Sequence, residues 1–312
     1  MKAVLPALAR PLLEPHLPAD LEVAWFIKPA EARASIAGAE IAWVDMQPTS
    51  LVAEAIRCAG PELRWVSTIY AGLDAFPLDL LSERKVILTN GAGINAAAVA
   101  DYAVMGVLAA AKRFDQVVRA QDRREWLRDA PGKIELDGTA ALVIGYGTIG
   151  RMIGDRLRAF GVAVSGVTRS GSDGTLTPDQ WRARLGEFDW VILAAPSTGE
   201  TRAMIGAAEL AAMKPAAWLV NIARGDMIDE PALLAALGSG AIGGAFLDPT
   251  DPEPLPPEHP LWTARNCMVT MHLSGRSQTS MFRRAAALFL DNLAAWREGA
   301  RMKNVADLDR GY

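Results

Sequence analysis

The chain has 312 residues, of which 51% are hydrophobic and 22% charged, and its net charge is −4. This length and composition predict two globular domains, each with enough apolar residues for a core. Because phosphate neutralisation needs clustered lysines and arginines, and the sequence has no basic run, nucleic-acid binding is not expected.

Neither export nor membrane insertion is expected. Pro6, Arg10 and Pro11 interrupt the apolar N-terminal run, and no later apolar segment is long enough to span a bilayer. The two cysteines, Cys58 and Cys267, lack the spacing of a metal site or a disulfide framework. We therefore expect no metal, and two free, buried thiols in a reducing cytoplasm.

The first hundred residues predict short strands that alternate with helices. Each candidate strand is a brief apolar run bounded by proline, glycine or polar residues, which suits a buried parallel strand. The candidates are residues 1–5, 21–26, 41–44, 64–67 and 86–88. This alternation favours an open parallel sheet with helices on both faces.

A long alanine-rich helix is predicted over residues 95–113, because strong helix formers fill it. A charged, tryptophan-containing segment, residues 120–134, then indicates an excursion or arm. A second alternating unit runs from residue 136 to about 272. The last predicted helix, over about 278–298, has apolar residues at helical spacing.

The strongest local signal is a glycine loop within residues 139–169. An apolar strand over 140–144 leads into Gly145-x-Gly147-x-x-Gly150, and a helix follows. Gly145 permits the tight turn, Gly147 admits a pyrophosphate, and Gly150 lets the helix pack against the strand. Because a helix N-terminus offers free N–H groups and partial positive charge, the segment predicts dinucleotide binding.

The end of the next strand, residues 163–167, predicts the choice of cofactor. NAD-selective folds usually place an acidic residue here, which accepts a hydrogen bond from the ribose 2′-hydroxyl. Thr168 stands in its place, and Arg169 and Ser170 follow. Because arginine pairs with a 2′-phosphate that a carboxylate would repel, we expect NADP(H) to be preferred, with use of NAD(H) left open. The alternative is that Arg169 is only a solvated loop charge.

Three further apolar strands, over residues 190–195, 218–221 and 267–271, end in polar residues. Arg224 comes just after the second, and His272 follows the third directly. Ligands of open α/β sheets bind beyond the carboxyl ends of the strands. We therefore expect both side chains to lie where the chemistry occurs.

Several ordered motifs give the chain a family resemblance. VIGYGTIG, LVNIARGDMIDEPALLAAL, LDPTDPEPLPPEHPLW and VTMHLSG resemble the D-isomer-specific 2-hydroxyacid dehydrogenases. The DPEPLP segment and the arginine after the second strand are most similar to glyoxylate/hydroxypyruvate reductases. The likeness runs from YAGLD, near residue 70, to the final helix.

The resemblance implies a catalytic set of Arg224, Glu253 and His272, and the chemistry of these side chains agrees with it. Arg224 can hold the carboxylate of a 2-oxo acid and polarise its ketone. His272 can donate a proton near neutral pH. Glu253 would orient the imidazole and favour its protonated form.

The resemblance also implies binding residues. The loop STIYAGLD, residues 67–74, would bind the substrate carboxylate through backbone N–H groups, with Ala71 and Gly72 as the donors. Tyr70 is a further candidate substrate contact, which either shapes the side-chain pocket or belongs to the core. Further cofactor contacts would fall on Thr148, Ile149, Ala195, Pro196, Thr201, Ala223 and Asp248.

Five further residues are considered for roles at or near the site. Met46 and Trp262 either shape the pocket or belong to the core. His16 and His259 are expected at the surface or in structural roles. Trp126, in the arm, is a candidate to reach a neighbouring subunit's site.

The chain departs from the family pattern at three positions. Ala216 replaces a glycine, Pro249 replaces a common valine, and Met271 replaces the proline before the histidine. The last departure leaves the backbone geometry beside His272 open. Glu253 in place of glutamine argues against a formate dehydrogenase.

The family's architecture implies two doubly wound parallel-sheet domains with a cleft between them. These are a Rossmann dinucleotide domain over residues 99–272 and a discontinuous, flavodoxin-like substrate domain over 1–98 and 273–312. A homodimer formed through residues 95–135 is expected.

The predicted reaction is NADPH-dependent reduction of glyoxylate, hydroxypyruvate or another small 2-oxo acid to the D-2-hydroxy acid. Two alternatives stay open. One is a dehydrogenase for phosphite or a branched 2-oxo acid, and the other is a nucleotide-sensing interaction module like the family's corepressor relatives.

Overall fold

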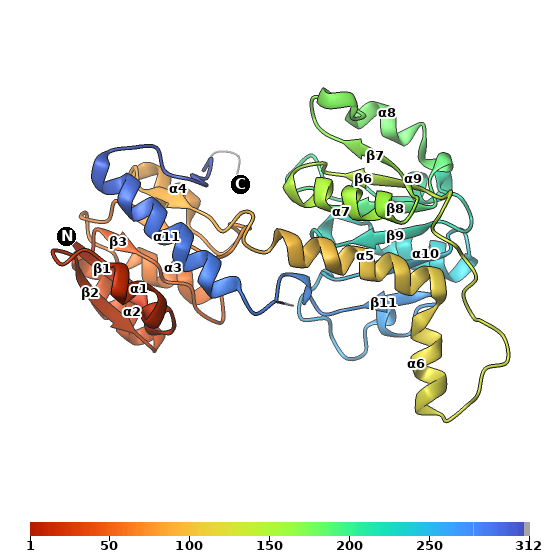
Figure 1. Cartoon of the computed structure of the whole chain (residues 1–312), viewed down its shortest axis with the longest axis horizontal. Coiled ribbons are helices and arrows are strands. Elements are labelled where there is room, and N and C mark those ends of the chain that lie inside the picture. Colours follow the sequence, from red (N-terminus) through yellow and green to blue (C-terminus); the bar gives the residue numbers. More distant parts are fainter. Residues whose placement is uncertain (277, 309–312) are drawn as a thin grey trace. The chain divides into compact units, whose positions relative to one another are not determined.

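The structure is a computed structural model that describes residues 1–276 and 278–308. It consists of two compact units: unit 1 comprises Met1–Asn95 and Gln278–Tyr312, and unit 2 comprises Ala96–Ser277. The division predicted from the sequence, after residues 98 and 272, differs from these bounds by a few residues. Each unit is built on a parallel sheet with helices, which confirms the predicted α/β class (Figure 1).

The sheet of unit 1 has the strand order β2-β1-β3-β4-β5, and its strands pair in parallel. This is the order of flavodoxin-like folds. The strands are β1 (Lys2–Pro6), β2 (Glu22–Phe26), β3 (Ile41–Ala42), β4 (Trp65–Ser67) and β5 (Ile87–Thr89). Each overlaps a strand predicted from an apolar run.

The C-terminal helix belongs to unit 1, although the strands of this unit come from the start of the chain (Figure 1). Its residue Phe289 stacks on Trp65, with ring centroids 5.0 Å apart, and lies 5.6 Å from Trp43. This buried aromatic cluster holds the helix on the sheet. The helices of unit 1 are α1 (Arg10–Leu13), α2 (Pro29–Ser35), α3 (Ser50–Arg57), α4 (Leu78–Glu83) and α11 (Met281–Glu298).

The sheet of unit 2 has the order β11-β10-β9-β8-β6-β7, again with parallel pairing. A parallel bridge joins Leu176 to Val167 of β7, where the third strand of a Rossmann sheet would lie. Strand order therefore reverses between β6 and β8, the position at which such sheets bind ligands. The strands are β6 (Ala140–Ile144), β7 (Ala163–Val167), β8 (Trp190–Leu193), β9 (Trp218–Asn221), β10 (Gly244–Leu247) and β11 (Cys267–Val269).

Three details of this sheet differ from the sequence analysis. Strand β10 was not predicted, because it begins at glycines that usually weaken a strand. Gly244 is required by packing, since a Cβ there would lie 2.6 Å from the Trp218 ring. Strands β8 and β11 end at Leu193 and Val269, before the predicted ends, because the chain turns away at the site described below.

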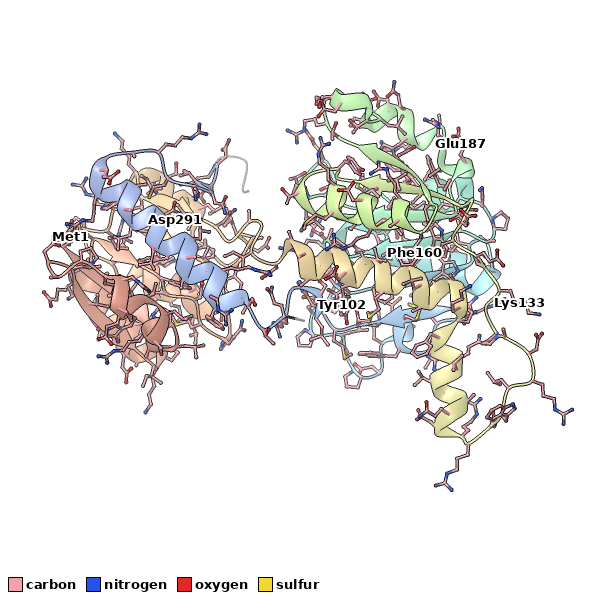
Figure 2. All side chains as sticks on the ribbon, in the orientation of Figure 1. Met1, Tyr102, Lys133, Phe160, Glu187 and Asp291 are labelled. Atoms are coloured by element: carbon pink, nitrogen blue, oxygen red, sulfur yellow. The ribbon has the colours of Figure 1, made fainter. Side chains whose placement is uncertain are left out.

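The helices of unit 2 also correct the predicted arm. Arg113 has a φ of 49° and separates the alanine-rich helix from a second helix, which the sequence analysis had placed partly in the arm. The irregular segment therefore starts after Asp122, and Figure 2 shows the labelled Lys133 on its returning part. The helices are α5 (Ala96–Lys112), α6 (Phe114–Asp122), α7 (Thr148–Ala159), α8 (Pro178–Arg182), α9 (Ala207–Ala212) and α10 (Glu230–Ser239). Among the described residues, no helix is long and apolar enough to cross a membrane.

Candidate active site

The glycine loop joins β6 to α7 in unit 2. Gly145 has a φ of 94°, and a Cβ there would lie 2.3 Å from the backbone nitrogen of Ala195. A Cβ on Gly150 would lie 2.2 Å from the carbonyl oxygen of Gly145, whereas one on Gly147 would meet no described atom within 4 Å. Packing therefore requires the first and third glycines, while the second leaves open space at the start of α7. This arrangement fits a pyrophosphate, because no acidic residue lies in the first turn of α7.

Thr168, Arg169 and Ser170 follow β7, as the sequence analysis predicted. The hydroxyl of Thr168 shares a 2.6 Å hydrogen bond with that of Thr175, so it is committed to its own turn. Arg169 Nη2 donates to Glu200 Oε2 at 2.8 Å, and both side chains are exposed. A phosphate that binds Arg169 must therefore displace the Glu200 carboxylate or bind the guanidinium next to it.

The other predicted cofactor residues surround the same strand ends. Thr201 Oγ1 donates to the carbonyl oxygen of Pro196 at 2.8 Å and accepts from the N–H of Thr198 at 2.8 Å. These bonds close the loop after β8 beside the glycine loop. Thr148 and Ile149 form the first turn of α7, and Ala195 and Ala223 follow β8 and β9.

The predicted catalytic residues follow three neighbouring strands. Arg224 follows β9, Glu253 lies in the loop after β10, and His272 follows β11. The Nδ1 atom of His272 and the Oε2 atom of Glu253 are 2.9 Å apart. Within the described part of the chain, the other imidazole nitrogen, Nε2, has no hydrogen-bond partner, so it is available to a ligand.

Electrostatics link all three side chains. Burial raises the pKa of Glu253, but the hydrogen bond from His272 and the nearby charges of His272 and Arg224 outweigh burial and lower it below its usual range. The second oxygen of Glu253 accepts from the N–H of Thr250 at 3.1 Å. Glu253 is therefore a fixed, ionised partner for the imidazole near neutral pH.

Two buried polar residues fix the backbone beneath this set, and sequence reasoning did not find their roles. Asn221 donates from Nδ2 to the carbonyl oxygen of Arg224 at 2.7 Å and accepts from the N–H of Ala223 at 3.0 Å. Asp248, predicted as a cofactor contact, has no exposed surface. Its carboxylate accepts from the Thr270 hydroxyl at 2.8 Å and from the N–H groups of the two residues after His272 at 2.8 and 3.0 Å.

The turn that carries His272 has an unusual backbone. Met271 and His272 have φ values of 54° and 53°, in the left-handed region that non-glycine residues seldom adopt. A proline cannot reach this conformation, because its ring fixes φ near −65°. The structure therefore gives a physical reason for the methionine that replaces the family's proline.

The predicted substrate loop lies in unit 1, after β4. The Tyr70 hydroxyl accepts from Gln47 Nε2 at 3.0 Å, and Met46 is buried in the core. Within the described residues, the N–H groups of Ala71 and Gly72 have no acceptor. Two adjacent donors of this kind can hold a carboxylate.

The histidines other than His272 do not join the catalytic set. His16 is exposed, and the Nε2 atom of His259 lies 3.1 Å from Glu230 Oε1. Trp262 donates from its ring N–H to the carbonyl oxygen of Pro256 at 2.8 Å. Trp126 is 94% exposed.

The prediction that both thiols are buried was wrong for Cys58. It is exposed and directly follows α3. Cys267 is buried, and burial raises the pKa of its thiol to about 12. The described residues contain no cluster of three or more metal-binding side chains.

Comparisons with known proteins agree with this geometry. Residues 104–274 match the family model of the NAD-binding domain of D-isomer specific 2-hydroxyacid dehydrogenases. Glyoxylate/hydroxypyruvate reductase B of Pectobacterium carotovorum is 33% identical over 258 residues, which cover 78% of this chain and 79% of that protein.

Two solved structures share the whole fold. A D-isomer specific 2-hydroxyacid dehydrogenase family protein of Aeromonas salmonicida has a TM-score of 0.88 and 27% identity, over 99% of both chains. The NADPH-dependent glyoxylate/hydroxypyruvate reductase of Sinorhizobium meliloti, in complex with citrate, has a TM-score of 0.82 and 25% identity, over 98% of both chains. The chain therefore belongs to the D-isomer-specific 2-hydroxyacid dehydrogenases, a family of NAD(P)-dependent oxidoreductases.

Proposed function

We propose that the protein uses NADPH to reduce a small 2-oxo acid of the glyoxylate or hydroxypyruvate type to the D-2-hydroxy acid. The observation that carries this proposal is the 2.9 Å pair of His272 and Glu253, whose carboxylate also feels the charge of Arg224. A proton donor and a cation next to each other are what reduction of a 2-oxo acid requires. The similarity to glyoxylate/hydroxypyruvate reductase B supports the substrate class.

Each catalytic side chain has a distinct task. The Arg224 guanidinium binds the substrate carboxylate and polarises the ketone. When bound, the nicotinamide supplies a hydride to the ketone carbon. His272 donates a proton from Nε2 to the ketone oxygen, which becomes the hydroxyl. Glu253 stabilises the imidazolium before this transfer and holds the ring by its Nδ1 atom.

Activity on a substrate panel tests this proposal. We expect NADPH absorbance to fall with glyoxylate and hydroxypyruvate, and His272→Ala to lose at least about 100-fold in kcat. His16→Ala is the control, because His16 is exposed in unit 1. Preferential reduction of a branched 2-oxo acid, or formation of NADPH from NADP⁺ with phosphite, would overturn the substrate class. Cofactor binding without turnover of any substrate would favour the interaction module.

We further propose that NADPH is preferred over NADH, with Arg169 holding the 2′-phosphate. Residue 168 is a threonine, so it cannot repel a 2′-phosphate as the usual carboxylate would, and the phosphate would replace or join Glu200 as the acceptor of Arg169. The solved Sinorhizobium meliloti relative is described as NADPH-dependent. Thr168 and Arg169, which follow β7, therefore both favour the phosphorylated cofactor.

Substitution of Arg169 tests the cofactor choice. Arg169→Asp should lower the ratio of kcat/KM with NADPH to kcat/KM with NADH by about tenfold or more, because it replaces attraction with repulsion. Arg184→Asp is a matched control, since Arg184 forms a similar exposed ion pair with Glu187 in the same unit. An unchanged ratio in Arg169→Asp would show that Arg169 is only a solvated charge.

We also propose a homodimer formed through residues 95–135, which include α5, α6 and the arm. Met105 of α5, Phe114 of α6 and Phe160, which directly follows α7, are 44%, 57% and 45% exposed. They line a shallow, mostly apolar hollow of about 590 Å³. Figure 2 labels Phe160, one of the residues that line this hollow. Apolar area of this kind is typical of a subunit interface.

A cytoplasmic location is part of the same proposal. Cys58 is a free, exposed thiol, and such thiols persist in reducing compartments. Fractionation of cells that produce the protein tests this location, and recovery in an oxidising compartment would contradict it.

A further inference from the structure

A carboxylate that the catalytic reaction does not use lies at the end of β3. Asp45 Oδ1 accepts from the Thr68 hydroxyl at 2.6 Å, and Oδ2 accepts from the Trp43 ring N–H at 2.7 Å. Oδ2 also accepts from the backbone N–H of Ile69 at 2.7 Å. Trp43 and Thr68 are buried and Asp45 is partly buried, so these residues form a built polar centre within unit 1.

The hydrogen bonds continue from Asp45 into the predicted substrate loop, residues 67–74. Thr68 Oγ1, which donates to Asp45, accepts from the N–H of Tyr70 at 3.0 Å. Asp45 and Thr68 thus occupy the N–H groups of Ile69 and Tyr70. The next two N–H groups along the chain, of Ala71 and Gly72, are left without an acceptor among the described residues.

The other side of this loop is held from the segment after β5. The N–H of Gly91 donates to the carbonyl oxygen of Tyr70 at 2.8 Å, and Asn90 Nδ2 donates to that of Ala71 at 3.3 Å. Both carbonyl oxygens are therefore turned toward residues 90 and 91. Because an amide group is planar, fixing the carbonyl of Ala71 also fixes the direction of the Gly72 N–H.

We propose that Asp45, acting through Thr68, is the positioning residue that orients the Ala71 and Gly72 N–H groups toward the carboxylate of the 2-oxo acid. This inference rests on the proposed function, because that function supplies the ligand. Asp45 does not touch the substrate. It sets substrate affinity by holding the peptide groups that do.

The chemistry of the centre explains why the residue is an aspartate. Three donors converge on it, and a carboxylate offers acceptor positions on both oxygens, whereas an asparagine would turn an NH₂ group toward a donor. Burial raises the pKa of Asp45 to about 6 despite these bonds.

Two substitutions separate this role from a general loss of folding. Asp45→Asn and Thr68→Val should each raise KM for glyoxylate about tenfold, with kcat changed by less than about threefold, because each removes a bond to a charged or buried partner. Thr68→Ser should behave as wild type, since it keeps the hydroxyl that bridges Asp45 to Tyr70. NADPH affinity, measured by fluorescence, should not change, because the dinucleotide loop lies in unit 2. Asp20→Asn is the control, since Asp20 is an exposed partner of Arg297 in unit 1.

Hydrogen exchange supplies a readout that does not need turnover. Asp45→Asn and Thr68→Val should speed exchange at the Ile69 and Tyr70 amides and leave the amides of α5 unchanged. Unchanged exchange, or faster exchange with an unchanged KM, would overturn the proposal. Equal losses in Thr68→Val and Thr68→Ser would also overturn it. If the wild-type protein turns over no 2-oxo acid, the proposed function fails, and the exchange data still decide whether Asp45 holds the loop.

Discussion

At the scale of single residues, the catalytic set depends on one carboxylate beside one imidazole. Glu253→Gln should lower kcat/KM for 2-oxo acid reduction by about 10- to 100-fold, because the neutral amide stabilises an imidazolium less than a carboxylate does. Steady-state kinetics with glyoxylate check this loss.

Glu258→Gln is the matched control for Glu253→Gln, since Glu258 is exposed in the same loop. A kcat/KM of Glu253→Gln equal to that of wild type would remove Glu253 from the mechanism. The lowered pKa of Glu253 means that its ionised form, and any stability from the pair, persists below the usual range and is lost only as the pH falls further. Both side chains are about 40% exposed, so we expect the stability effect to be small.

Asp45 predicts a pH dependence of the opposite sign. Burial raises its pKa from 3.8 to about 6, so the native state favours the protonated form. Its contribution to stability is therefore full below about pH 4 and is lost as the pH rises through 6, an effect of about 2–3 kcal/mol. The free energy of unfolding of wild type minus that of Asp45→Asn should fall by this amount between about pH 4 and 7. Urea titrations across this range check it, and a constant difference would contradict the prediction.

At the scale of elements, the turn after β11 decides where His272 lies. Met271→Gly should keep activity and raise stability by up to about 1 kcal/mol, because glycine adopts a positive φ without a Cβ penalty. Met271→Pro should lower kcat at least about tenfold, although it restores the family's residue, because proline cannot adopt a φ of 54°. Kinetics and thermal unfolding of the two variants check this pair. Full activity of Met271→Pro would show that the turn takes another conformation.

At the scale of the whole molecule, the α5–α6 face predicts the oligomeric state. Met105→Glu should convert a dimer to a monomer, because it places a charge in the apolar hollow. Ile27→Glu is a matched control, since Ile27 is 80% exposed in unit 1. Sedimentation equilibrium measures both. A wild-type monomer, or a Met105→Glu dimer, would contradict the proposed interface.

The sequence by itself determined the parts of this protein that rest on local pattern. Apolar runs predicted the parallel strands other than β10, because strands buried on both faces are mostly continuous hydrophobic runs. The spacing of Gly145, Gly147 and Gly150 predicted the dinucleotide loop, because Gly145 and Gly150 avoid backbone clashes and Gly147 leaves open space for a pyrophosphate. The order of motifs predicted the family, and with it Arg224, Glu253 and His272.

Only the tertiary structure decided which polar groups meet. Glu253 and His272 lie in different loops and come within 2.9 Å because β10 and β11 pair side by side. The support given to the turn after His272 by Asp248, to Ile69 by Asp45 and to Tyr70 by Thr68 depends on backbone N–H groups, which every non-proline residue carries. The sequence does not reveal such contacts, because the fold, and not the residue type, determines which backbone N–H group lies next to the carboxylate.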